Sequence, residues 1–163
     1  MALVKGDGKE MKKMLKIFTG SLMFITILWG CSGNPTEHNN SGSSGLLDCP
    51  DTPNCVSSLA KNAKHRVEPF KLKKDPKTSW DIVQQTVGLL PRTKIVSADN
   101  SNIHAECKSI VFRFIDDLTL HLTPSNGMIH IRSASRTGYS DLGVNRRRVE
   151  NLRKKLQHKD IVE

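Results

Sequence analysis

The sequence predicts an α+β domain, in which four or five mainly antiparallel strands form a sheet and helices pack on one of its faces. Three observations predict this class. Residues 79–90 carry apolar side chains at helical spacing, and residues 93–132 then alternate apolar and polar side chains with a period of two. A second helical pattern follows Asp141. Strands joined by short polar turns pair antiparallel, so the alternating segment favours a mainly antiparallel sheet.

The first thirty residues have the organisation of an export signal, with lysines ahead of an apolar stretch from residue 17 to residue 29. A helix that crosses a bilayer needs about 20 apolar residues. This stretch is shorter and is interrupted by polar residues, so an uncleaved signal anchor is the weaker alternative. Met11 opens a more typical signal than Met1, and translation starts at one of these two.

Leu28-Trp29-Gly30-Cys31 resembles the lipobox of bacterial lipoproteins. It predicts a signal peptide over residues 1–30, cleavage before Cys31, and acylation of that cysteine by chains such as palmitate. More than one acyl chain gives stable membrane attachment. Ser32 is not the aspartate that favours inner-membrane retention, so the expected location is the outer membrane, facing the periplasm. Residues 31–45 then form the lipidated cysteine and a flexible polar tether, and residues 46–163 form one globular domain.

The net charge of the mature chain limits the classes of partner that we expect. The full chain has 25 basic and 16 acidic residues, and the predicted leader removes five and two of these, which leaves an excess of six positive charges. An exported protein rarely meets nucleic acid, so we expect none as a partner. Acidic glycans, phospholipid headgroups and anionic small molecules are the expected partners, beside the membrane that holds the anchor. A basic surface that serves only solubility is the alternative, and the oligomeric state is open.

Cys49 and Cys55 bracket a short loop that Pro50 and Pro53 stiffen. In an exported protein such a pair favours a disulfide. Free thiols and a metal site are the alternatives. Zinc sites usually combine CxxC-like pairs with a second pair of ligands, and neither is present here.

The expected helix at residues 79–90 has Thr78 or Ser79 as its cap and Pro91 after its end. In the strands that follow, Cys107 shares a face with Ile103 and is expected to be a buried core residue rather than a reactive thiol. The expected strands are residues 93–98, 103–115, 118–123 and 129–132, with a turn at 124–127 and an edge strand at 65–70. A last helix begins near Asp141 or Leu142 and carries the apolar stripe Val149, Leu152 and Leu156.

Four motifs stand out: CPDTPNCVSS at 49–58, LPRTKIV at 90–96, the stretch from HAE at 104 to FRFIDD at 117, and IRSASRTGYSDLGVNRRRVENLR at 131–153. Together they resemble the domain-of-unknown-function 1499 family, over nearly all of residues 46–156. The resemblance implies an envelope protein of bacteria or plastids with no assigned biochemistry. It contributes a domain boundary and motif residues, and no reaction.

The long motif places three consecutive arginines in the first turns of the last helix, where the helix dipole disfavours positive charge. Either protein carboxylates compensate, through Glu106, Asp116, Asp117, Asp141 and Glu150, or the arginines and helix N–H groups bind a phosphate, sulfate or carboxylate ligand. The candidate anion-binding residues are Arg132, Ser133, Ser135, Arg136, Tyr139, Ser140, Asn145, Arg146 and Arg148.

His104, Glu106, His121 and His130 are expected on one polar face of the sheet, where His121 lies opposite His130 and Thr119 opposite Arg132. They are candidate metal ligands, although solvated side chains are the simpler interpretation. No catalytic or nucleotide-binding motif is present, and no cofactor is expected. The leading hypothesis is a noncatalytic binding module for an anionic ligand or partner. The alternatives are a structural or assembly lipoprotein with an internal charge network and a metal-assisted enzyme.

Overall fold

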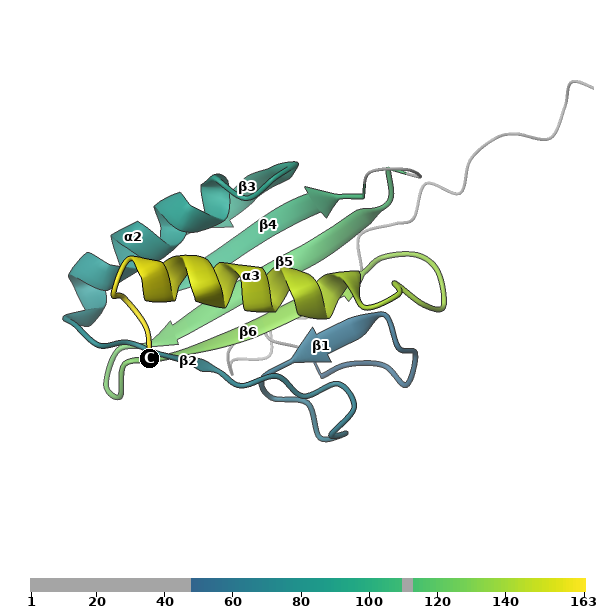
Figure 1. Ribbon diagram of the computed structural model, residues 1–163, viewed down its shortest axis with the longest axis horizontal. Helices are drawn as coiled ribbons and strands as arrows, with labels where there is room; N and C mark the ends of the chain where they lie inside the picture. The colour runs from purple at the N-terminus through teal and green to yellow at the C-terminus, as the bar shows by residue number, and fades with distance from the viewer. Residues whose placement is uncertain (1–47, 110–112) are drawn as a thin grey trace, which may run out of the picture. The chain divides into compact units, whose positions relative to one another are not determined.

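The computed structural model describes residues 48–109 and 113–163 of the chain (Figure 1). The predicted leader, Cys31 and the predicted tether lie outside the described residues, as does part of the strand expected at residues 103–115. Within the described ranges, the helices are all too short or too polar to cross a membrane.

One antiparallel sheet organises the described residues. Its order is β1-β6-β5-β4-β3, and β2 also pairs with β6. The strands are β1 (Cys55–Ser57), β2 (Phe70–Lys71), β3 (Thr93–Ala98), β4 (Asn102–Lys108), β5 (Ile115–Thr123) and β6 (Met128–Ser135). The alternating pattern predicts the four long strands, and the α+β class is confirmed. The strand expected at residues 103–115 is too long, because β4 ends at Lys108 and Ile115 begins β5.

Two short strands complete the edge beside β6 and bring the sheet to six strands. β1 has three residues and β2 has two, which is too few for an alternating pattern to be visible. The edge strand expected at residues 65–70 is wrong in its position, because β2 begins only at Phe70. Arg66 forms an isolated bridge with Ser57 instead.

Helices α2 (Pro76–Gly88) and α3 (Val144–His158) cover the same face of the sheet (Figure 1). The cap predicted for the first helix is wrong. Asp75 is the N-cap, its carboxylate accepts a hydrogen bond of 2.9 Å from the Thr78 N–H, and Pro76 follows in the first turn, where it needs no hydrogen-bond partner for its nitrogen. The helix therefore begins three residues before the predicted start.

Helix α3 begins two or three residues after its predicted start, because the chain turns sharply before it. Leu142 and Gly143 both have positive φ, +51° and +76°. The Asp141 carboxylate accepts hydrogen bonds from the Gly143 N–H at 2.9 Å and the Asn145 N–H at 2.6 Å. Asp141 thus caps the helix from outside it.

Alternation along the strands creates two faces, which we call the helix face and the open face. The helix face holds the core, and its fully buried members include Ile103, Ala105, Leu118, Leu120, Ile129, Ile131 and, on α3, Val149, Leu152 and Leu156. Cys107 is a free thiol buried in this cluster, as expected. The open face carries the polar positions, and there His121 lies opposite His130 and Thr119 opposite Arg132, which confirms the predicted register.

Candidate functional site

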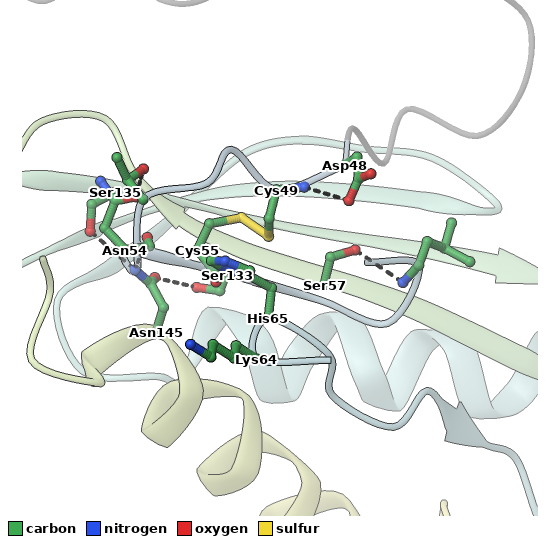
Figure 2. The surroundings of a disulfide bond; sticks show 12 residues. Asp48, Cys49, Asn54, Cys55, Ser57, Lys64, His65, Ser133, Ser135 and Asn145 are labelled. Carbon is green, nitrogen blue, oxygen red and sulfur yellow. Dashed lines mark hydrogen bonds between the residues drawn. A yellow bond between two sulfur atoms is a disulfide. The ribbon is translucent and has the colours of Figure 1, made fainter. Parts of the chain in front are cut away.

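Cys49 and Cys55 form a disulfide, which confirms the predicted pairing (Figure 2). The loop that it closes is tied to the long motif. Asn54 donates its side-chain amide to the Gly138 carbonyl, and the Asn54 carbonyl accepts a hydrogen bond of 2.9 Å from the Asn145 side chain on α3. The first and last motifs of the chain therefore meet at one corner of the fold.

Asn145 is the centre of this corner and is completely buried. Its amide nitrogen donates to the Asn54 carbonyl and, at 3.0 Å, to Ser135 Oγ. Its amide oxygen accepts from Ser133 Oγ at 2.7 Å and from the Arg148 guanidinium. Every side-chain hydrogen-bonding group of Asn145 is therefore used inside the protein.

Arg148 reaches from α3 to the helix face of β5. Its guanidinium donates to Asp116 Oδ2 at 2.5 Å and to Ser133 Oγ at 2.8 Å. The Asp116 residue is only 3% exposed, so this is a buried ion pair with additional hydrogen bonds. One arginine of the triple run is therefore compensated by a carboxylate of the protein.

Arg136 lies in a second ion pair, on the open face. It donates Nε to Asp117 Oδ2 at 2.9 Å and Nη2 to both Asp117 Oδ1 and Glu106 Oε1 at 2.8 Å. His104 Nε2 contacts the same Asp117 oxygen at 2.8 Å. Burial alone would raise the pKa of Asp117, but the hydrogen bonds from His104 and Arg136 and the arginine charge outweigh it and lower that pKa below its usual value. The same pairing raises the pKa of Arg136.

Arg146 points away from both ion pairs. Its guanidinium donates to the Arg66 carbonyl at 2.9 Å and the Lys64 carbonyl at 2.7 Å. With Tyr139 it lines a cavity of about 410 Å³ beside the disulfide. The ionic groups there are balanced, because Lys64 and Arg146 are accompanied by the two aspartates Asp51 and Asp141.

Arg132 lies on the open face between Thr119 of β5 and Ser57 of β1. Its Nε is buried and has no hydrogen-bond partner among the described residues. Burial lowers the pKa of its guanidinium, and the charges of Asp117 and Asp48 act in the opposite direction. The structure thus separates Arg132 and Arg136, on the open face, from Ser133, Ser135, Asn145 and Arg148, on the helix side.

The candidate metal ligands have separate partners. His104 and Glu106 contact the ion pair of Arg136, whereas His121 Nδ1 contacts Asn102 Oδ1 at 2.7 Å and His130 Nδ1 contacts Ser58 Oγ at 3.3 Å. Within residues 48–109 and 113–163, no group of three or more histidine, cysteine, aspartate or glutamate side chains is arranged to hold a metal ion. Burial, with a smaller contribution from the charge of His121, lowers the pKa of His130.

A groove of about 980 Å³ lies beside α3 on the helix side of the sheet. Its other wall comes from the α2–β3 turn, the end of β4, the start of β5 and the turn before α3. Ser135, Ser140 and Arg148 of the predicted anion site line it. Its other basic side chains are Arg92, Lys108, Arg147, Lys154 and Lys155, with His158 at the end of α3.

None of these five lysines and arginines was predicted from the sequence as an anion-binding residue, although Arg147 belongs to the predicted run of three arginines beside the core-facing stripe of α3. A second stripe follows the same helical spacing and contributes to the groove: Val144, Arg147, Arg148, Asn151, Lys154, Lys155 and His158. It contains no carboxylate. The only acidic residue of α3, Glu150, instead pairs with Arg153 at 2.9 Å.

Comparison with known proteins gives a family and no closer relative. No curated protein and no solved structure matches the chain significantly. A family model described as a protein of unknown function, DUF1499, matches residues 45–156. That range contains the disulfide loop, all six strands, both ion pairs and nearly all of α3. The chain therefore belongs to the DUF1499 family.

Proposed function

We propose that the protein is a bacterial envelope lipoprotein, anchored through Cys31 to the outer membrane and facing the periplasm, whose folded domain is a noncatalytic binding module for an anionic ligand. The observation that carries the binding proposal is the charge of the groove beside α3. Six lysine and arginine side chains line it, against two aspartates. Like charges gathered at one surface repel each other, and a bound anion relieves that repulsion.

Both aspartates of the groove are already engaged. Asp116 pairs with Arg148, and Asp141 accepts the N–H groups that precede and open α3. Among the described residues, neither Lys154 nor Lys155 forms a salt bridge. The cations available to a ligand are therefore Lys154 and Lys155 of the second stripe and those of the opposite wall, rather than the paired Arg148.

The binding proposal is tested by titrating the purified full chain with inorganic phosphate or sulfate. Calorimetry measures the binding, and thermal melting measures the change in stability. Lys154→Ala combined with Lys155→Ala should weaken binding by about fivefold or more, since two cations near one anion contribute roughly 0.5 to 1 kcal/mol each at a surface. The matched control is Lys61→Ala with Lys77→Ala, which removes the same charge outside the groove. Equal affinities for the two double variants would overturn the groove as the site.

The anchor is tested separately in cells. Inhibition of lipoprotein signal peptidase should produce a precursor of larger mass, and Cys31→Ser should abolish acylation. An unmodified Cys31 with an uncleaved leader would remove the lipid anchor, favour the signal-anchor alternative and leave the binding proposal to be judged by the titration.

A structural or assembly role is the second candidate function, and the buried network of Asn145, Arg148 and Asp116 favours it. In that case the motif stabilises the domain and the groove cations serve solubility. No anion would then change the melting temperature at any concentration tested, while substitution of Arg148 would still lower it.

A further inference from the structure

We propose that the groove beside α3 takes an anionic amphiphile, in which one long alkyl or acyl chain carries a phosphate, sulfate or carboxylate head. This inference rests on the proposed function and names the class of its ligand. It starts from the apolar residues of the groove, which a small inorganic anion would leave uncovered.

Apolar side chains line the groove between its cations: Leu90, Pro91, Cys107, Phe114, Leu142 and Val144. Four of them are open to solvent, Pro91 among them. Leu142 is 84% exposed, Phe114 47% and Val144 36%. Large exposed apolar side chains gathered in a concave surface are typical of a ligand-binding site rather than of an ordinary solvated surface.

Leu142 is unfavourable in two respects. Its φ of +51° lies in the left-handed region, which costs a leucine roughly 1 to 2 kcal/mol relative to the ordinary helical region. Its side chain also buries almost no surface within the described residues. Asparagine or glycine would suit this backbone better, so the leucine is unexplained by the stability of the domain. An apolar partner in the groove explains it.

The two lysines that α3 contributes to the groove are separated along the helix from its exposed leucine, whereas Arg147 lies beside Leu142 and donates a hydrogen bond of 2.8 Å to its carbonyl. Leu142 and Val144 lie at the start of the helix, and Lys154 and Lys155 lie near its end. From Val144 to Lys155 the helix rises about 16 Å, at 1.5 Å per residue. An elongated ligand with one charged end and one apolar end matches this separation. Its head lies against the lysines and its chain extends toward Leu142.

The occupant is a single amphiphile rather than a bilayer surface. Part of the lining lies deep between the two walls, including Cys107, which is 2% exposed, and Asp116, which is 3% exposed. A flat membrane would reach only the exposed rim. The volume of about 980 Å³ is at the upper end of the range for small-molecule sites, which suits one long chain and its head.

Calorimetric titration of the full chain tests the ligand class with four probes: inorganic phosphate, butyl phosphate, dodecyl phosphate and the neutral dodecyl maltoside, each below its critical micelle concentration. We expect dodecyl phosphate to bind at least tenfold more tightly than butyl phosphate, because burial of additional methylene groups is favourable by up to about 0.8 kcal/mol each. Dodecyl maltoside should bind at least tenfold more weakly than dodecyl phosphate.

Two variants separate the head from the chain. Asparagine suits a left-handed backbone, so the Leu142→Asn variant should fold. It should bind dodecyl phosphate about threefold or more weakly than the parent and bind inorganic phosphate with unchanged affinity. The double variant Lys154→Ala with Lys155→Ala should bind both dodecyl phosphate and inorganic phosphate more weakly than the parent. Equal affinity for all three phosphates, or a Leu142→Asn variant identical to the parent, would overturn the amphiphile and leave the anion site standing. Equal binding of dodecyl maltoside, or binding only to anionic vesicles, would overturn it as well. Failure of every phosphate probe to bind would overturn both proposals.

Discussion

The Arg148 guanidinium on α3 and the Asp116 carboxylate on β5 form an ion pair with an N–O distance of 2.5 Å, and both side chains are largely buried. Their neighbours in the chain behave differently. Asp117 points to the open face, where it pairs with Arg136, and Arg146 ends on backbone carbonyls. Arg136, Arg146 and Arg148 therefore have partners within the protein, whereas Lys154 and Lys155 of the groove form no salt bridge among the described residues.

Arg148→Ala should destabilise the domain by about 3 kcal/mol, because it leaves the Asp116 carboxylate buried without its cation. Arg146→Ala, two residues earlier, should cost less than about 1 kcal/mol, since its carbonyl partners can turn to water. Urea unfolding of the two variants measures the difference. Equal losses would show that the Arg148–Asp116 pair does not stabilise the fold.

Asn145→Asp should destabilise the domain by about 2 kcal/mol or more. A carboxylate cannot donate to the buried Asn54 carbonyl or to the partly buried Ser135 Oγ, so both acceptors lose this donor, and a second negative charge joins Asp116. Thermal melting provides the measurement, and Asn151→Asp on the groove side of α3 is the control for the charge change. A melting temperature equal to that of the control would contradict the role of Asn145 as the centre of this corner.

The low pKa of Asp117 predicts a specific loss of stability in acid. A carboxylate whose pKa is lower in the folded than in the unfolded state stabilises the fold above its unfolded pKa, near 3.9, and loses that contribution as the pH falls toward its folded pKa. Unfolding free energies measured from neutral pH to below about pH 4 should therefore fall more steeply for the parent than for Asp117→Asn. Parallel curves would indicate that Asp117 has no preferential interaction in the folded state.

Reduction of the disulfide should cost about 2 kcal/mol, because Cys49 and Cys55 are six positions apart and close only a small loop in the unfolded chain. Unfolding with and without dithiothreitol measures this. The Cys49→Ser variant contains its own control, since its stability should be lower than that of the oxidised parent and insensitive to the reductant. An oxidised parent no more stable than the variant would disprove the contribution.

The sequence predicted the elements that repeat a pattern over several residues. Period-two alternation located the four long strands. Elements without a repeat were missed. β1 and β2 are too short to show alternation, and the capping residue Asp75 lies ahead of the first periodic position.

The candidate site was predicted less completely, because its composition depends on how α3 lies on the sheet. Arg146 and Arg148 are nearly adjacent in the chain but point in different directions around the helix axis. Arg148 therefore reaches a carboxylate, whereas Arg146 reaches two backbone carbonyls. The stripe of Arg147, Lys154 and Lys155 could have been read from its spacing. Its opposite wall, with Arg92 and Lys108, depends on tertiary packing and could not.

The most direct test of the groove as the binding site is a residue-by-residue amide NMR map of the full chain, recorded with and without dodecyl phosphate. We expect the shifted amides to follow the groove, from Leu142 along the second stripe of α3 to Lys155, together with Arg92 and Lys108. Shifts concentrated instead on the open face around His104 and Arg136, or around Tyr139 and Arg146 beside the disulfide, would contradict it.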